Sequence, residues 1–405
     1  MTSSDRADRV SEATAFGGWA PSDRERVAAI GAAIACVAVV GIGLSLSIPL
    51  LSIEMERRGA SSTLIGLNTA MAGISSICIV PFVPRIAAWM GVVPLLVLSL
   101  VVSAASLVAF PLLPGLWLWF PLRFVFSAGL GALFVLSEYW INAAAPPARR
   151  GLVLGIYTTV LAIGFAVGPV LVALVGTTGL GPYLTGAALV LAGILPVFLA
   201  RGLSPAVAGG TGRGVLGYIR LAPPALLAAL AYGAVETGIF AILPLYGLRI
   251  GYDAQGAASL VSLIALGNVL FQIPFGWLAD RVDRVAVLLG TTLACAAGSA
   301  LIPAASGSGL ALGTLLFLWG GLAGTLYTVG LAALGARVPP GDLAGANATF
   351  VVLYNVGLIL GPPVIGGGLD LTPPDGFAYA LLALFLAYAA ALVVSRRRGW
   401  GHPSP

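Results

Sequence analysis

The chain has 405 residues, of which 59% are hydrophobic and only 9% are charged, and its formal net charge is +5. Soluble domains are about half apolar and about a quarter charged, so this composition excludes a soluble globular protein and indicates a membrane protein. All twenty basic residues are arginines that lie mostly in short stretches between apolar runs, which is a topology pattern and not a nucleic-acid footprint.

Apolar runs of about 20 residues, the length that a helix needs to cross the bilayer core, recur along the chain. We predict twelve membrane-spanning helices, at residues 28–52, 61–83, 92–112, 116–139, 151–175, 181–200, 219–247, 257–279, 285–304, 308–335, 343–368 and 376–395. They fill nearly the whole chain and leave no room for a folded soluble domain. The expected fold class is an all-α membrane protein.

The arginines predict how the helices are oriented. Residues 1–27 carry acids as well as arginines and lack the apolar core of a signal peptide, so we expect a cytoplasmic tail. With the N-terminus inside, sixteen arginines fall on the cytoplasmic side, Arg57, Arg58 and Arg249 on the outer side, and Arg123 within a span. The positive-inside rule then places both termini in the cytoplasm of a bacterial inner membrane.

The chain repeats itself at an offset of 193 residues. This register pairs Pro81-Phe82 with Pro274-Phe275, Gly131 with Gly324, Pro146-Pro147 with Pro339-Pro340, Gly164 with Gly357, and Gly168-Pro169 with Gly361-Pro362. We therefore expect six-helix pseudo-symmetric halves at 28–200 and 219–395, a cytoplasmic linker at 201–218 and a cytoplasmic tail at 396–405. Two like halves are what alternating access requires.

Three motifs occupy defined places in these halves. The sequence GWLADRVDR, Gly276 to Arg284, joins the eighth and ninth spans, whereas its first-half counterpart PFVPRIAAWMG has Ala87 where the register demands the acid. The sequence RFVFSAGLGAL begins the fourth span with Arg123. Gly-x-x-x-Gly-Pro motifs in the fifth and eleventh spans comprise Gly164, Gly168 and Pro169, and Gly357, Gly361 and Pro362. With these motifs, the repeat and the twelve spans, residues 28 to 395 resemble the major facilitator superfamily and its bacterial drug and sugar efflux branch.

The resemblance implies a secondary transporter whose charged loop forms a cytoplasmic gate. Asp280 is expected to accept hydrogen bonds from a neighbouring helix N-terminus, near Gly151, while Arg281 and Arg284 hold it. The alternative is a short charged loop that only fixes topology. The Gly/Pro motif resembles the antiporter signature and favours export, although close helix packing alone also requires such residues.

Three ionisable residues lie within the predicted spans and are functional candidates. Glu236 is mid-span in the seventh helix, one turn after Tyr232, and a carboxyl that alternates between buried and water-exposed settings can bind and release a proton. The alternative is a neutral Glu236 that serves helix packing. Arg123 could attract an anionic substrate, pair with Glu236, or anchor on backbone carbonyls. Glu138 is expected to join the gate.

The gate partner of Glu138 is expected to be Arg149 or Arg150. Uncharged polar residues complete the candidate site: Asn268 and Gln272, four residues apart on the eighth span, and Tyr354 and Asn355 on the eleventh. Few charges and many aromatic residues suit small amphipathic substrates.

We predict proton-coupled efflux, with uptake by proton symport or a membrane sensor on the same scaffold as alternatives. The sole histidine, His402, lies in the tail and the chain has no lysine, so no catalytic triad, His-containing metal site or phosphate loop is expected. The chain is expected to be a monomer in the lipid bilayer, with no enzyme activity, cofactor, metal or nucleic-acid partner.

Overall fold

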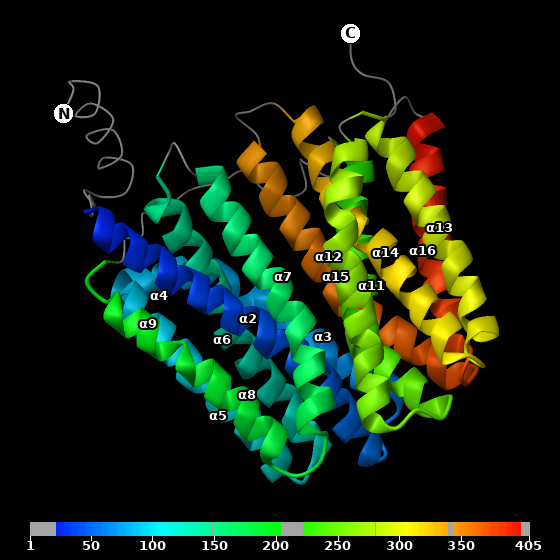
Figure 1. Ribbon diagram of the computed structural model, residues 1–405, viewed down its shortest axis with the longest axis horizontal. Helices are drawn as coiled ribbons and strands as arrows, with labels where there is room; N and C mark the ends of the chain where they lie inside the picture. Colours follow the sequence, from blue (N-terminus) through cyan, green and yellow to red (C-terminus); the bar gives the residue numbers. More distant parts are fainter. Residues whose placement is uncertain (1–21, 147–149, 204–221, 280, 339–342, 398–405) are drawn as a thin grey trace. The chain divides into compact units, whose positions relative to one another are not determined.

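The computed structural model describes residues 22–146, 150–203, 222–279, 281–338 and 343–397. In chain order the elements are α2 (Asp23–Arg57), α3 (Ser62–Ile79), η1 (Val80–Phe82), α4 (Val83–Met90), α5 (Val92–Leu112), η2 (Leu116–Leu118), α6 (Trp119–Ala144), α7 (Arg150–Val175), α8 (Gly181–Ala192), α9 (Ile194–Leu199), α11 (Pro223–Arg249), α12 (Ala254–Ala279), α13 (Arg284–Ala305), α14 (Gly309–Arg337), α15 (Leu343–Leu371) and α16 (Gly376–Arg397). Twelve segments within the described ranges are long and apolar enough to cross a membrane, which confirms the predicted fold class (Figure 1).

Prolines interrupt two of the predicted spans. The second span is divided into α3, η1 and α4 around Pro81 and Pro84, and the sixth is divided into α8 and α9 just before Pro196. Proline has no backbone N–H and cannot bond to the carbonyl four residues earlier. The second span continues through α4 to Met90, past its predicted end at 83, whereas the sixth ends at Leu199, next to its predicted end at 200.

Several helices extend beyond the predicted boundaries, and three of these extensions carry charged residues into one end of unit 2. The helices α2, α11 and α15 end at Arg57, Arg249 and Leu371, whereas the predicted spans end at 52, 247 and 368. The extensions bring Glu56, Arg249 and Asp370 into helical segments, and these charged residues become important below.

Contacts divide the chain into two compact units. Unit 1 comprises residues 1–47, 75–168 and 178–211, and unit 2 comprises residues 48–74, 169–177 and 212–405. The last part of α2, the first part of α3 and the end of α7 thus pack with the second half of the chain. The predicted division into sequential halves, with its linker and tails, stays a prediction.

In unit 1, glycines bring α2 and α7 into backbone contact. A Cβ atom built on Gly41 would lie 2.7 Å from the carbonyl oxygen of Leu161, and one built on Gly168 would lie 2.6 Å from the backbone nitrogen of Leu46. Real Cβ atoms essentially never approach closer than 3.0 Å, so only glycine fits. Helix α5 packs against α6 and α8 in the same unit.

In unit 2, α11 is central and packs against α12, α14, α15 and α16 (Figure 1). The close approach of α2 and α7 is repeated by α11 and α15. A Cβ atom built on Gly357 would lie 2.2 Å from the carbonyl oxygen of Leu230, and one built on Gly361 would lie 2.0 Å from that of Ala234. Glycines paired by the 193-residue register therefore have the same role, which is to let two helix backbones touch.

Arginines make similar contacts at the ends of α2 and α11, at an offset of 192 residues and thus one residue out of the 193-residue register. Arg57, which ends α2, donates to the backbone oxygen of Thr177, and Arg249, which ends α11, donates to the backbone oxygen of Leu369 at 2.9 Å. Both pairs are separated by 120 residues along the chain. In each half, an arginine thus ties the end of the first helix to the end of the fifth.

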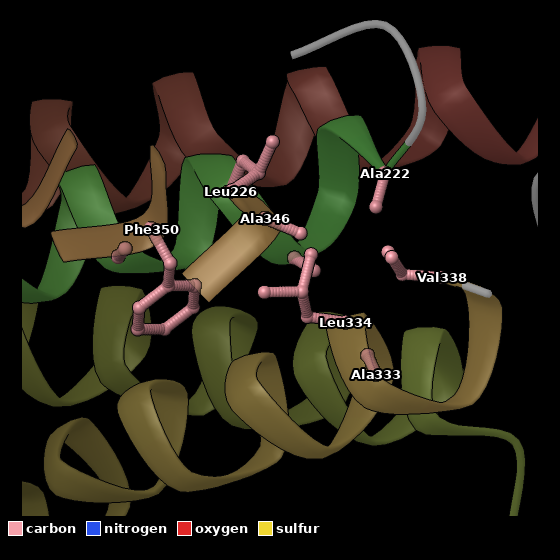
Figure 2. Close-up of a cluster of buried hydrophobic side chains, with 9 residues drawn as sticks. Ala222, Leu226, Ala333, Leu334, Val338, Ala346 and Phe350 are labelled. Atoms are coloured by element: carbon pink, nitrogen blue, oxygen red, sulfur yellow. The ribbon is translucent and has the colours of Figure 1, made fainter. Parts of the chain in front are cut away.

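An apolar cluster fills the opposite end of unit 2. Figure 2 shows Leu226 of α11, Leu334 of α14 and Phe350 of α15 meeting there, each at most 1% exposed. Tyr327 and Tyr354 pack against the cluster, so it forms an apolar floor next to these two rings.

Candidate functional site

Glu236 lies at the centre of a hydrogen-bonded network in unit 2. Tyr232, one turn earlier on α11, donates its hydroxyl to Oε1 of Glu236 at 2.7 Å, and Tyr354 of α15 donates its hydroxyl to Oε2. Asn268 of α12 donates its Nδ2 amide to the Tyr232 hydroxyl at 3.0 Å, and Gln272 donates its Nε2 amide to Oδ1 of Asn268 at 2.9 Å. Five of the residues expected to form the site are therefore joined, from three helices.

Stacked aromatic rings support this network. The ring of Tyr232 lies 5.5 Å from that of Tyr327 and 6.1 Å from that of Tyr354, and Tyr327 lies 5.8 Å from Tyr354 between ring centroids. These are favourable aromatic separations. Tyr327 also contacts Phe350 edge to face, so the apolar floor fixes the positions of the two hydroxyl groups that face Glu236.

The hydrogen-bond partners of the Glu236 carboxyl group are neutral. Both of its oxygens accept from phenol hydroxyls, and among the described residues it takes part in none of the ion pairs. An ionised carboxylate is an acceptor only, whereas a protonated one also donates. The arrangement suits a group that gains or loses a proton, because no fixed cation holds it in one state.

Two candidate residues lie elsewhere. Asn355 follows Tyr354 but donates its Nδ2 amide to the carbonyl oxygen of Val351 on its own helix, 2.8 Å away, so it is not joined to the Glu236 network. Arg123 belongs to unit 1. Its side chain is 1% exposed, and its Nε and Nη2 atoms have no hydrogen-bond partner among the described residues. Its pairing with Glu236 stays a prediction.

The predicted gate loop is only partly described. Asp280 lies outside the described residues, so its contact near Gly151 stays a prediction. Asp283 accepts the backbone N–H of Ala286 at 2.8 Å and caps the N-terminus of α13, a role that we had not assigned to it. Arg281 lies over the Trp277 ring, 3.7 Å from its centroid.

The structure gives fewer contacts for the other residues of the predicted gate. Glu138 is exposed at the surface of α6, and its backbone oxygen accepts from Asn142 at 2.8 Å. Arg149 lies outside the described residues, as does the side chain of Arg150, so the predicted ion pair stays a prediction. Gly276 has no heavy atom within 4 Å of a built Cβ position, so packing does not require glycine there.

The sequence reasoning missed Tyr327 and Asp370. Tyr327 lies on the predicted tenth span, where nothing in the sequence distinguishes it from other polar residues; its ring contacts with Tyr232 and Tyr354 do so. Asp370 was excluded because the predicted eleventh span ended at residue 368, whereas α15 continues to Leu371. A longer span would have added Asp370 to the ionisable residues within helices.

Comparisons with known proteins agree with this architecture. The profile of the family described as Major Facilitator Superfamily matches residues 33–267 and 225–404. The chain is 28% identical over 371 residues to the MFS-type transporter YfkF of Bacillus subtilis (strain 168), which covers 90% of this chain and 94% of that protein.

Two solved structures have the same fold. The nucleoside transporter NupG aligns with a TM-score of 0.72 at 16% identity, covering 94% of this chain and 100% of that chain. A bacterial homolog of the human lysosomal transporter Spinster aligns with a TM-score of 0.71 at 14% identity, covering 95% of this chain and 100% of that chain. With its twelve spans and the matching profile, this multi-pass membrane protein belongs to the major facilitator superfamily, a family of transporters and not of enzymes.

Proposed function

We propose that the chain is a proton-coupled secondary transporter that exports small amphipathic molecules by alternating access, with Glu236 as the proton site. The observation that carries the proposal is the partly buried network in which two tyrosine hydroxyls, and no cation among the described residues, contact the Glu236 carboxyl. Ionisable residues within membrane helices are costly and mark transport pathways. The surrounding tyrosine rings supply apolar surface and the amides supply polarity, which together suit an amphipathic substrate.

The hydrogen bonds give the two carboxyl oxygens different roles. Gln272 fixes the Asn268 amide, and Asn268 in turn donates to the Tyr232 oxygen, so the Tyr232 hydrogen is directed at Oε1 of Glu236. Tyr354 has no such second donor among its described contacts. A proton added at Oε2 can therefore be donated to the Tyr354 oxygen if the Tyr354 hydroxyl hydrogen rotates away. The proton is taken up with one hydroxyl rotation and no rearrangement of helices.

The network also connects the carboxyl group to an exposed surface. Gln272 is exposed, Asn268 and Glu236 are partly buried, and Tyr232 is 8% exposed. Gln272 and Asn268 lie one turn apart on α12, so the polar residues form a continuous path toward Glu236. A substrate that binds beside this path would disturb the hydrogen bonds to Glu236 and so change how readily its carboxyl group holds a proton.

We further propose that the chain is a monomer in a bacterial inner membrane with both termini in the cytoplasm. The support is the unequal distribution of arginines between the two predicted sides. In this orientation the ends of α2, α11 and α15 face outward. We use "outer" for that end below.

The proton assignment can be tested with purified, detergent-solubilised protein. Drugs, sugars and organic acids are added one at a time, and proton release is measured for the native protein and for Glu236→Gln. We expect a substrate to release protons from the native protein only. Equal behaviour of both proteins toward every compound would make Glu236 structural and remove the main support for proton coupling.

Direction is tested separately in membrane vesicles. Accumulation of the substrate in inverted vesicles with an acidic lumen would support antiport, whereas accumulation in right-side-out vesicles with an acidic exterior would support symport uptake. A protein that binds compounds but moves none of them would be a sensor and not a transporter.

A further inference from the structure

Five charged or hydroxyl residues meet at the outer end of unit 2. They are Glu56 of α2, Ser62 and Thr63 of α3, Arg249 of α11 and Asp370 of α15, and we call them the outer cluster. The Asp370 carboxylate accepts the backbone N–H of Ser62 at 3.0 Å, the backbone N–H of Thr63 at 2.8 Å and the Thr63 hydroxyl at 2.7 Å.

Arg249 completes the cluster from α11. Its Nη2 atom donates to the Ser62 hydroxyl at 2.7 Å and lies 3.3 Å from Oδ1 of Asp370 and 3.6 Å from Oε1 of Glu56. The side chains of Arg249, Glu56 and Asp370 are 23%, 24% and 26% exposed. Partly buried, charge-assisted hydrogen bonds of this kind are stronger than neutral ones and less screened by salt than those on an open surface.

Asp370 caps a helix to which it does not belong. The first N–H groups of a helix have no partner within the helix, and a side chain just before the helix normally satisfies them. For α3 two of these N–H groups are satisfied by Asp370, which is 308 and 307 residues distant in sequence from Ser62 and Thr63. The hydroxyl of Ser61, just before the helix, accepts only the N–H of Leu64 among the described residues, at 3.2 Å. The N–H groups of Ser62 and Thr63 therefore depend on α15 for their partner.

The internal repeat shows that α12, the helix of the second half that corresponds to α3, is capped in a different way. In the 193-residue register, Thr63 corresponds to Gly256 near the start of α12. There the cap is local, because Asp253 accepts the N–H of Gly256 at 2.8 Å. The first half has Ala60 in place of Asp253, and Thr177 in place of Asp370. The first half thus has no acid at the local capping position of α3. The acid that caps α3 belongs to the second half, on α15.

Backbone contact continues below the cluster. A Cβ atom built on Gly366 would lie 2.3 Å from the carbonyl oxygen of Ser62, and one built on Gly66 would lie 2.4 Å from that of Pro362. Helices α3 and α15 thus touch without intervening side chains, and the outer cluster closes the end of this contact.

We propose that the outer cluster is a latch that holds the outer ends of α3 and α15 together, and that Asp370 is its central residue. The inference rests on the alternating-access function proposed above, which requires these two ends to part, since α3 and α15 lie in different predicted halves. Parting leaves two α3 N–H groups without their cap and separates Arg249 from the Ser62 hydroxyl. The latch therefore favours the state with a closed outer side.

Distance measurements between spin labels test the latch without a substrate. The labels are attached at Leu67→Cys, which is exposed on α3, and at Gly307→Cys, which is exposed in the connection between α13 and α14. The background is Cys78→Ser, because Cys78 is exposed whereas Cys36 and Cys295 are buried. We expect Asp370→Asn to raise the ratio of long to short distances at least tenfold, equivalent to about 1.4 kcal/mol. Asp375→Asn removes the same charge outside the outer cluster and should leave the ratio unchanged.

A second variant separates latching from helix capping. Ala60→Asp combined with Asp370→Asn supplies α3 with a local cap like that of α12, so the fold and its thermal stability should be restored while the long distances persist. Restoration of the short distances as well would show that Asp370 acts only as a cap and would overturn the latch.

The remaining outcomes distinguish the latch from the transport cycle. Long distances that appear equally in the native protein and in Asp370→Asn would overturn the latch and leave alternating access intact. A single short distance in every variant, with or without a transported compound, would contradict both.

Discussion

Replacing Gly361 by alanine should separate α15 from α11. A Cβ atom at this position would lie 2.0 Å from the carbonyl oxygen of Ala234 and 2.4 Å from its carbonyl carbon. Because real Cβ contacts are essentially never under 3.0 Å, the helices must move apart by at least 1.0 Å, the difference between 3.0 and 2.0 Å. The clashing atoms belong to the backbone, so no side-chain rotation can relieve the clash.

The expected loss of stability is modest but measurable. Overpacking of this kind costs about 1–3 kcal/mol, and the better helix propensity of alanine offsets up to about 1 kcal/mol, so we expect a net destabilisation of about 1–2 kcal/mol. The same helix contact presents Tyr354 to Glu236, so substrate-induced proton release should also weaken.

Thermal unfolding in detergent provides the assay. A thiol-reactive dye is used in the Cys78→Ser background, because Cys78 is exposed and would react before unfolding; the dye then reports unfolding when it reaches Cys36 and Cys295, which are buried and free. Gly290→Ala is the matched control, because no heavy atom lies within 4 Å of a Cβ built there, and its melting temperature should equal or exceed that of the native protein. If Gly361→Ala melts as late as Gly290→Ala, the tight backbone contact is refuted.

Two further substitutions test the site and the gate loop. Tyr354→Phe removes the donor to Oε2 of Glu236. Since hydrogen bonds to charged groups contribute about 1.5–3 kcal/mol, proton release should occur at a clearly different pH from that of the native protein. An unchanged pH profile would exclude Tyr354 from the proton site. Asp283→Ala removes the cap of α13 and should cost about 1 kcal/mol in thermal unfolding, whereas Asp283→Asn, which can still accept from Ala286, should lose far less. Equal melting temperatures for both Asp283 variants would contradict the capping role.

Local spacing predicted much of the Glu236 site. Tyr232 and Glu236, and likewise Asn268 and Gln272, are four residues apart, which places each pair on one helix face whatever the tertiary structure. Both pairs are hydrogen-bonded. That Asn268 bonds to Tyr232, and that Tyr354 rather than Asn355 faces Glu236, depends on how α12 and α15 pack against α11.

The cytoplasmic gate stays a prediction, because Asp280, the carboxylate expected at a neighbouring helix N-terminus, lies outside the described residues. The structure shows a contact of the same kind at a different place, between Asp370 and the start of α3. The motif resemblance directed attention to the charged loop, and a helix boundary three residues too short concealed Asp370.

The sequence by itself determined the number of spans, the helical fold and the internal repeat, because hydropathy over about 20 residues and a fixed glycine register are local or periodic properties of the chain. Only the tertiary structure decided which half supplies the cap of α3, how the glycine contacts align, and which tyrosines face Glu236. These depend on contacts between residues more than 100 positions apart, such as Tyr354 with Glu236 and Asp370 with Thr63. Hydrophobicity places the helices in the membrane without selecting their partners, and it is close backbone packing at glycine together with the pairing of buried polar groups that selects them.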